Sequence, residues 1–358
     1  MQSYEYERFV IQSFRERDTK RVGAGARRTS MSARFRFPRL DHRRAVIAVS
    51  IGLAAGLLAY AFLRRPGSGG DYFFVWSAAR SFFAGQNPYH VIAQGPENPG
   101  NDVFLYPLPA LLVVAPVAWL PLAASGGLFL GLSSALLAYG LLRDGYRRLP
   151  LFMGAPFLMA VSLGQWSPLV TAAGLESSLG FVFAAKPNLG LAAWLYRPNV
   201  RAIVGGLLIV VVSLAILPTW PVDWYHNIAS RPEKFSPIRT LAGPLLLAAA
   251  FRWRRPEARL LLAMACVPQA LFFYDQLILG LIPRTFRQSL IFSLASFVLL
   301  LTWFHRLGPG DYYVQKAIPY ALWLYLVALV MVLWPDPKAA TASSVAEPRD
   351  ATEAPIPT

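Results

Sequence analysis

The sequence predicts an all-α membrane protein, a polytopic transmembrane helical bundle of about nine to eleven spans. Hydrophobic residues make up 55% of the 358 residues and charged residues only 15%, whereas about 25% charged residues is usual in a soluble domain. The mean hydropathy is +0.42. Several apolar runs approach the roughly 20 residues that a helix needs to cross about 30 Å of hydrocarbon. Together these observations exclude a soluble globular protein.

The apolar runs are of two kinds, continuous and interrupted. The clear candidates for spanning helices are 45–63, 125–142, 200–217, 258–279, 288–305 and 317–334. The ambiguous runs are 105–121, 149–163, 166–196 and 240–251, and proline, glycine or a charged residue breaks several of them. Broken helices are tolerated in a membrane where neighbouring helices or a water-filled cavity satisfy the freed backbone groups. The breaks are therefore consistent with a cavity.

Polar segments flank this predicted membrane domain, which covers 45–334. Residues 1–44 contain twelve Lys/Arg and five Asp/Glu, and 335–358 are rich in Ala, Ser, Thr, Pro and acidic residues. Both compositions are typical of disorder. The positive charge of the first segment places it in the cytoplasm. Met31 is an alternative to Met1 as the start of translation.

The net charge of +15 is explained by the orientation of the helices, so no nucleic-acid partner is expected. Basic clusters recur at 143–148, 197–201 and 252–255, each between apolar runs. If 104–121 spans the membrane, simple alternation puts the first two clusters outside. If that run is re-entrant, all three clusters are cytoplasmic, and Gln165, 218–239 and Asp275 approach the outer face. The charge distribution favours the re-entrant arrangement.

In the predicted first external loop, 64–104, residues 72–83 have the pattern of a helix. Its apolar face has helical spacing and consists of Tyr72, Phe73, Val75, Trp76, Ala79, Phe82 and Phe83. Gly85 and Asn87-Pro88 then end the helix. The pattern fits an amphipathic interfacial helix lying along the bilayer, and it fits an ordinary packing helix equally well.

Asp71 is the first candidate for chemistry, because it follows the flexible stretch 66–70 at the membrane surface. A carboxylate in this position can act as a general base toward a hydroxyl nucleophile. Asp is also a favoured N-cap residue, and the two roles are compatible.

Several motifs resemble glycosyltransferase family 87, within the C-type superfamily of integral-membrane glycosyltransferases. They are Asp71-x4-Trp76, Gly85-Gln86-Asn87-Pro88-Tyr89, Phe104-x-Tyr106-Pro107-Leu108, Gly164-Gln165, Ala184-Ala185-Lys186-Pro187 and Tyr274-Asp275. The resemblance covers residues 70–280 and depends on the order and spacing of the motifs. This superfamily includes mannosyltransferases that use polyprenyl-phosphate mannose.

The resemblance implies a multi-pass enzyme of the cytoplasmic membrane that works at its external face in building the cell envelope. The donor would be a polyprenyl-phosphate sugar, mannose-like, and the acceptor a lipid or glycan. Asp71 would deprotonate the acceptor hydroxyl, which displaces the lipid phosphate with inversion. The substrate-binding candidates are Arg80, Asn87, Tyr89, Asp102, Tyr106, Gln165, Lys186, His226 and Asp275.

The charged candidates also have more ordinary interpretations. A charge inside an apolar run costs about 2.5–3.5 kcal/mol on insertion, so Lys186 and Asp275 should face a cavity or a partner. Snorkelling and helix-end solvation are the alternatives. Asp102 fits turn chemistry. His226 lies in an aromatic loop that suits either sugar stacking or interfacial anchoring.

Metal chemistry and other function classes stay open at this point. The four histidines are far apart in the sequence and lack zinc-ligand spacing, whereas a carboxylate-bound divalent cation is possible. The single cysteine, Cys266, forms no intrachain disulfide. A carrier or flippase for a lipid-linked sugar is the first alternative function, because broken helices are typical of transporters. A noncatalytic membrane scaffold is the second.

Overall fold

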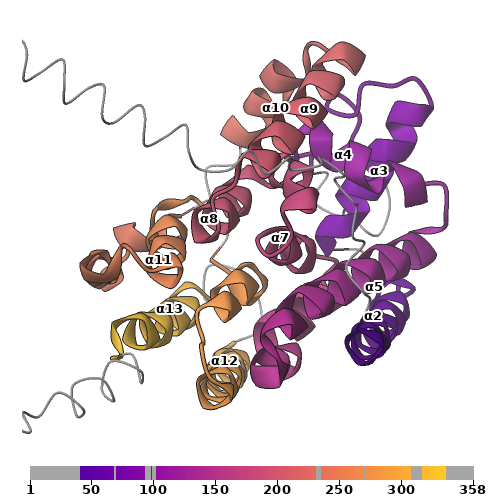
Figure 1. Ribbon diagram of the computed structural model, residues 1–358. Coiled ribbons are helices and arrows are strands. Elements are labelled where there is room, and N and C mark those ends of the chain that lie inside the picture. The colour runs from indigo at the N-terminus through magenta and orange to yellow at the C-terminus, as the bar shows by residue number, and fades with distance from the viewer. Residues whose placement is uncertain are drawn as a thin grey trace, which may run out of the picture. The chain divides into compact units, whose positions relative to one another are not determined.

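The computed structural model describes residues 41–67, 70–92, 98, 102–230, 235–269, 271–307 and 317–335 (Figure 1). The chain divides into Met1–Leu40 and Asp41–Thr358, and all that follows concerns the second unit. The regular elements in the described ranges are helices, with one isolated antiparallel bridge between Phe235 and Gln269. The predicted all-α class is confirmed. The disorder expected for 1–40 and 336–358 lies outside the described residues.

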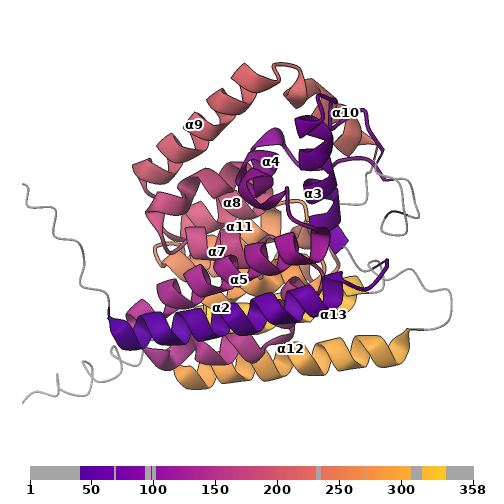
Figure 2. The same cartoon turned by 90° about the vertical axis from the view of Figure 1, so that its right-hand side faces the viewer.

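Three helices are long and apolar enough to cross a membrane. They are α2 (His42–Leu63), α5 (Leu122–Leu141, extended by a short turn to Asp144) and α12 (Phe286–Arg306). Figure 2 shows that their axes are nearly aligned. A fourth candidate is the pair α9 (Val200–Ile216) and α10 (Trp220–Ala229), which is bent by 100°. A membrane protein is thus supported, whereas the described ranges contain three or four full-length spans rather than nine to eleven.

The remaining elements are shorter than a membrane is thick. They are α3 (Gly70–Phe83), α4 (Leu108–Val114), η1 (Ala115–Val117), η2 (Leu142–Asp144), η3 (Tyr146–Met153), α6 (Ala155–Ser162), α7 (Ser167–Ala173), η4 (Ser177–Ala184), α8 (Pro187–Tyr196), η5 (Pro237–Arg239), η6 (Gly243–Arg252), α11 (Pro256–Cys266), η7 (Phe273–Leu281) and α13 (Ile318–Leu333). Proline occupies one of the first two positions of α4, α6, α7, α8, α11 and α13, where its missing N–H costs nothing.

The prediction of one span over 258–279 is wrong. Helix α11 ends at Cys266, and η7 begins only at Phe273. Pro268 has no N–H to donate to a continuing helix, and Leu271 has a φ of 50°, a conformation that costs a non-glycine residue energy. The break therefore delivers Tyr274 and Asp275 at the start of a new element.

Helices α2 and α5 pack side by side and antiparallel (Figures 1 and 2). Their seam is made of glycines: a Cβ added at Gly52 would lie 2.7 Å from the Gly131 carbonyl oxygen, and one at Gly56 2.9 Å from that of Gly127. Small residues allow such close backbone approach in membranes. This pair forms a frame that separates two ends of the protein by about 33 Å, the length of a 22-residue helix.

The predicted basic clusters meet at one end of this frame. Arg44 at the start of α2 donates to the Tyr139 carbonyl near the end of α5. Arg148, only 2% exposed, donates to the Leu281 carbonyl at 2.8 Å and to the Tyr196 hydroxyl at 3.2 Å. Arg259 donates to the Leu195 carbonyl. The loops at 143–148, 197–201 and 252–255 thus share one side, as the re-entrant arrangement requires.

The run 104–121 is too short to cross the bilayer. Its helical part, Leu108–Val117, has ten residues and is about 15 Å long. This length also favours the re-entrant arrangement of 104–121.

Helix α3 follows the other end of α2 and crosses its direction, as Figure 2 shows. Its apolar face is buried against α4 and α5: Tyr72, Val75 and Ala79 are fully buried. The Tyr72 hydroxyl lies 2.7 Å from Ser125 Oγ. Phe83, by contrast, is 63% exposed. The expectation of an apolar face lying in the bilayer is therefore wrong for most of α3, which is a packing helix.

Candidate functional site

The carboxylate of Asp71 lies in the first turn of α3 and accepts a hydrogen bond of 2.8 Å from the Tyr106 hydroxyl. Gly70 has a φ of 53°, and a Cβ there would lie 2.2 Å from the Leu163 carbonyl oxygen. The turn that carries Asp71 is therefore packed closely against the backbone of Leu163. Asp71 is inside the helix rather than at its N-cap, where its charge still suits the positive end of the helix dipole.

Tyr106 is fixed from several directions. The Tyr89 hydroxyl donates to its carbonyl oxygen at 3.0 Å, and its ring lies 6.0 Å from that of Trp166. Burial, followed by the charge and hydrogen bond of Asp71, raises the pKa of the Tyr106 phenol well above its ordinary value, and Tyr274 and Asp275 act in the same direction. The phenol thus keeps its proton and remains a donor to Asp71.

Lys186 and Asp275 form a buried ion pair of 2.8 Å between the start of α8 and the start of η7. The side chains are 11% and 3% exposed. Lys186 Nζ also lies 5.5 Å from the centroid of the Tyr274 ring, within the range of a cation–π interaction. Both charges are thus paired, as their cost in an apolar segment demands.

The two pairs belong to one group. Tyr274 lies within electrostatic reach of both Asp71 and Asp275, and Tyr106 is affected by Asp71 and Asp275 alike. We call Asp71, Tyr106, Lys186, Tyr274 and Asp275 the Asp71 cluster. It draws on four segments that are distant in the sequence, and it combines two carboxylates, two phenols and one ammonium group.

Two buried glutamine side chains have amide atoms without a hydrogen-bond partner. Gln276 follows Asp275 and is fully buried, and neither its Oε1 nor its Nε2 has a hydrogen-bond partner in the structure. Gln165 is 1% exposed; its Nε2 donates to the Leu163 carbonyl at 3.4 Å, while its Oε1 has no partner. Buried polar groups left unpaired are rare and call for an explanation, such as a ligand.

Helix α10 contacts the two segments that carry Tyr89 and Tyr106. The Asp223 carboxylate accepts hydrogen bonds from Asn87 Nδ2 and Thr219 Oγ1, both at 3.0 Å. Trp224 Nε1 donates to the Leu105 carbonyl next to Tyr106. Asn87 is thus a residue that fixes the loop carrying Tyr89, and it does not touch the cluster directly.

Besides Asn87, the predicted site residues Arg80, Asp102 and His226 are not brought to the cluster. Arg80 is exposed, lies over the Trp76 ring and is nine residues from Asp71 along α3, about 14 Å. Asp102 forms a turn in which its N–H donates to Asn98 Oδ1 at 2.7 Å. His226 is exposed on α10 beside Tyr225.

The structure adds residues that the sequence prediction omitted. Trp166 packs against Tyr106, and the charges of Asp71 and Asp275 both act on Tyr274; each neighbours a predicted residue, so adjacency was the available signal. The Tyr325 hydroxyl donates to Gln269 Oε1 at 2.7 Å inside the core. For Tyr325 and Gln269 the signal was a polar group inside an apolar run.

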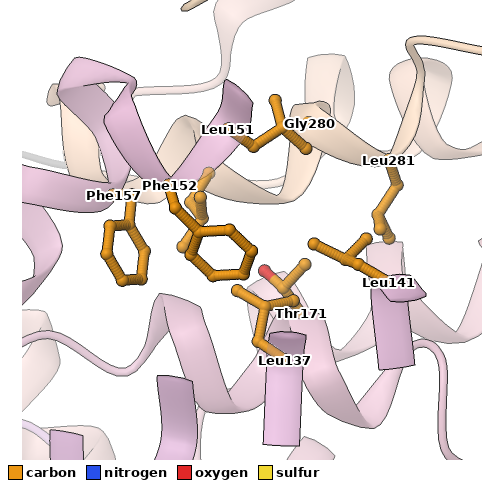
Figure 3. A pocket seen from close by; sticks show the side chains of 9 residues that line it. Leu137, Leu141, Leu151, Phe152, Phe157, Thr171, Gly280 and Leu281 are labelled. Carbon is orange, nitrogen blue, oxygen red and sulfur yellow. The ribbon is translucent and has the colours of Figure 1, made fainter. Parts of the chain in front are cut away.

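Two small pockets lie elsewhere. Figure 3 shows the first, an apolar seam with no room for a water molecule, lined by Leu137, Leu141, Leu151, Phe152, Phe157, Thr171, Leu277, Gly280 and Leu281. The second, a hollow with room for about one water, lies between α3 and the residues Pro88, Val91, Asp102 and Phe104, and includes Ser77 and Ser81 of α3. Neither pocket is lined by a member of the Asp71 cluster, so they describe packing rather than the site.

A metal site is not assembled within the described residues, since no three His, Cys, Asp or Glu side chains gather there. A divalent cation therefore stays a prediction. The chemistry available to the Asp71 cluster itself is proton acceptance by a carboxylate, hydrogen bonding by phenols and anion binding by the ammonium group.

Comparison of the chain with family models, curated proteins and solved structures found no match.

Proposed function

We propose that this protein is a membrane glycosyltransferase of the C-type superfamily, transferring a mannose-like sugar from polyprenyl phosphate to a hydroxyl of a lipid or glycan. The observation that carries the proposal is the Asp71 cluster, in which a carboxylate oriented by Tyr106 lies close to a buried Lys186–Asp275 pair. The motif order resembles glycosyltransferase family 87 along the same residues. The external membrane face is the proposed side, because α2 separates Asp71 from the basic end.

In the proposed reaction Asp71 takes the proton of the acceptor hydroxyl. The acceptor oxygen forms a bond to the anomeric carbon while the bond from that carbon to the phosphate oxygen breaks, and the polyprenyl phosphate leaves with the electron pair. One displacement inverts the anomeric configuration. Tyr106 holds the carboxylate in place through its hydrogen bond. The carboxylate therefore loses less orientational freedom on reaching the transition state.

Lys186 is the proposed ligand of the leaving phosphate. It is the one cation of the Asp71 cluster, whereas Arg80 and Arg239 are exposed elsewhere and Arg231 and Lys234 lie outside the described residues. Positive charge near developing negative charge lowers the barrier in a site shielded from water. Asp275 keeps the ammonium group paired and in position before substrate arrives.

Mass spectrometry of membrane glycolipids tests this proposal in cells. A strain lacking the protein and a strain carrying Asp71→Asn should lose the same glycolipid, because both lack the base. Asp41→Asn is the matched control: Asp41 caps α2 at the basic end, and Asn is an equally good cap. If Asp71→Asn keeps the glycolipid that the deletion loses, the protein acts as a scaffold.

A carrier for a lipid-linked sugar is the second candidate. The buried Lys186–Asp275 pair favours it, because it lies beside the interruption between α11 and η7 at 267–272. Transporters place charges at such broken helices. Sealed vesicles containing the protein separate the two functions. A transferase makes a new glycosidic bond in them, while a carrier moves labelled lipid across the membrane and makes none.

A further inference from the structure

Arginines are concentrated at the basic end of the described unit, and the proposed reaction does not explain them. Of the 19 Lys/Arg in the described ranges, 13 lie there, with four carboxylates: Asp41, Asp144, Glu176 and Glu257. We call this end the basic face; its arginines, exposed or partly exposed except for the buried Arg148, are Arg43, Arg44, Arg143, Arg147, Arg148, Arg197, Arg201, Arg252, Arg254, Arg255, Arg259, Arg284 and Arg287. Its net charge is about +9, which makes it an anion-binding surface.

The charges are held together by specific contacts at one corner of the face. Arg255 Nη1 and Arg284 Nη2 both donate to the Trp334 carbonyl, at 3.4 and 3.5 Å. The two guanidinium groups, from segments 29 residues apart, are therefore at most about 7 Å from each other, the sum of these distances. Arg147 joins them through the Arg284 carbonyl at 3.3 Å.

Helices α11 and α12 begin at this corner, and α13 ends there at Leu333. Helix α11 starts at Pro256 and the spanning helix α12 at Phe286, so their positive dipole ends add to the arginines. Exposed aromatic side chains lie beside these arginines: Trp253 is 60%, Phe286 52% and Trp334 60% exposed. Aromatic residues next to basic ones mark the headgroup depth of a membrane.

We propose that the basic face binds anionic phospholipid headgroups, with its tightest site at the corner formed by Arg254, Arg255, Arg284 and Arg287. The phosphates accept charge-assisted hydrogen bonds from the guanidinium groups, and the flanking aromatic rings lie along the upper acyl chains. Basic pockets beside spanning helices suit such lipids. The bound lipids fix the membrane depth of α12, whether or not the protein transfers sugar.

Native mass spectrometry of the full-length protein in detergent tests this proposal. The protein is titrated with dioleoyl phosphatidylglycerol or dioleoyl phosphatidylcholine at equal concentrations, and retained lipid is counted. The wild type should retain phosphatidylglycerol in preference. The double variant Arg254→Gln/Arg287→Gln, which changes two exposed side chains, should lose this preference by about 25-fold, from about fivefold for each arginine.

The matched control is Arg64→Gln/Arg65→Gln, which removes two exposed arginines at the opposite end of α2. It should retain phosphatidylglycerol as the wild type does. Equal unfolding temperatures of the two variants confirm that both fold. The proposal is overturned if the wild type retains both lipids equally, or if the control loses phosphatidylglycerol as strongly as the basic-face variant.

Discussion

The ion pair of Lys186 and Asp275 has a cost as well as a role. Removing two charges from water costs several kcal/mol for each ion, and the attraction at 2.8 Å offsets much of this only while both partners are present. A hydrophobic pair of similar size would be about as stable. Stability alone therefore does not explain why the charges are kept, which is consistent with the proposed role of Lys186 as a cation held ready for a phosphate.

Replacing one partner of this pair should destabilise the protein strongly. Lys186→Met leaves Asp275 buried without its cation, and we expect a loss of about 3–5 kcal/mol in the free energy of unfolding. The double variant Lys186→Met/Asp275→Leu should regain most of that stability while remaining inactive in sugar transfer. Thermal unfolding in detergent, followed by circular dichroism, measures the first effect. A single variant as stable as the wild type would show that the pair is not buried and coupled.

Much of the site was predictable at the residue scale. Asp71, Lys186 and Asp275 were found because a carboxylate or ammonium group near an apolar run must have a reason to be there. Arg80 was grouped with them, but the structure does not bring it to the cluster, because its position relative to the site depends on the packing of α3. His226 is not brought there either: α10 directs Asp223, and not His226, toward the loop of Asn87.

Short helices with proline starts are the main feature at the element scale. Proline reads in the sequence as an interruption, yet in α8 and α11 it occupies the first helical position, where its fixed φ is favourable. The sequence predicted where apolar runs lie but overestimated how many are continuous helices. Hydropathy shows that a segment avoids water. It does not show whether the segment lies in lipid as one helix or in a protein core that encloses a break such as 267–272.

The glycine seam between α2 and α5 should tolerate no side chain. Gly56→Leu places its Cβ where the Gly127 carbonyl oxygen is 2.9 Å away, so the helices must separate, at a cost of about 1–3 kcal/mol or more. Gly206→Leu on α9 is the control, because the nearest atom to its Cβ is 3.8 Å away. Unfolding temperatures in detergent should fall for the first variant only; an equal fall in both would contradict the seam.

At the scale of the whole described unit, the two ends of the α2–α5 frame differ in chemistry. The basic face occupies one end, while Asp71 follows the other end of α2. By the positive-inside tendency, the proposed orientation has the Asp71 cluster toward the external side. The charge pattern predicted that the basic loops share one end, because charged loops are exposed and easily read. The convergence of Tyr106, Tyr274 and Asp275 depends on long-range packing, which local patterns do not contain.

Sugar transfer by the purified protein tests the central claim most directly. The wild type, Asp71→Asn and the control Asp41→Asn are incubated with a radiolabelled polyprenyl-phosphate sugar and a membrane lipid extract as acceptor. We predict a labelled glycolipid with inverted anomeric configuration from the wild type and the control. Asp71→Asn should lose at least a hundredfold in rate, as expected on removal of a general base. Transfer by Asp71→Asn at the rate of the wild type would contradict the assignment of Asp71 as the base.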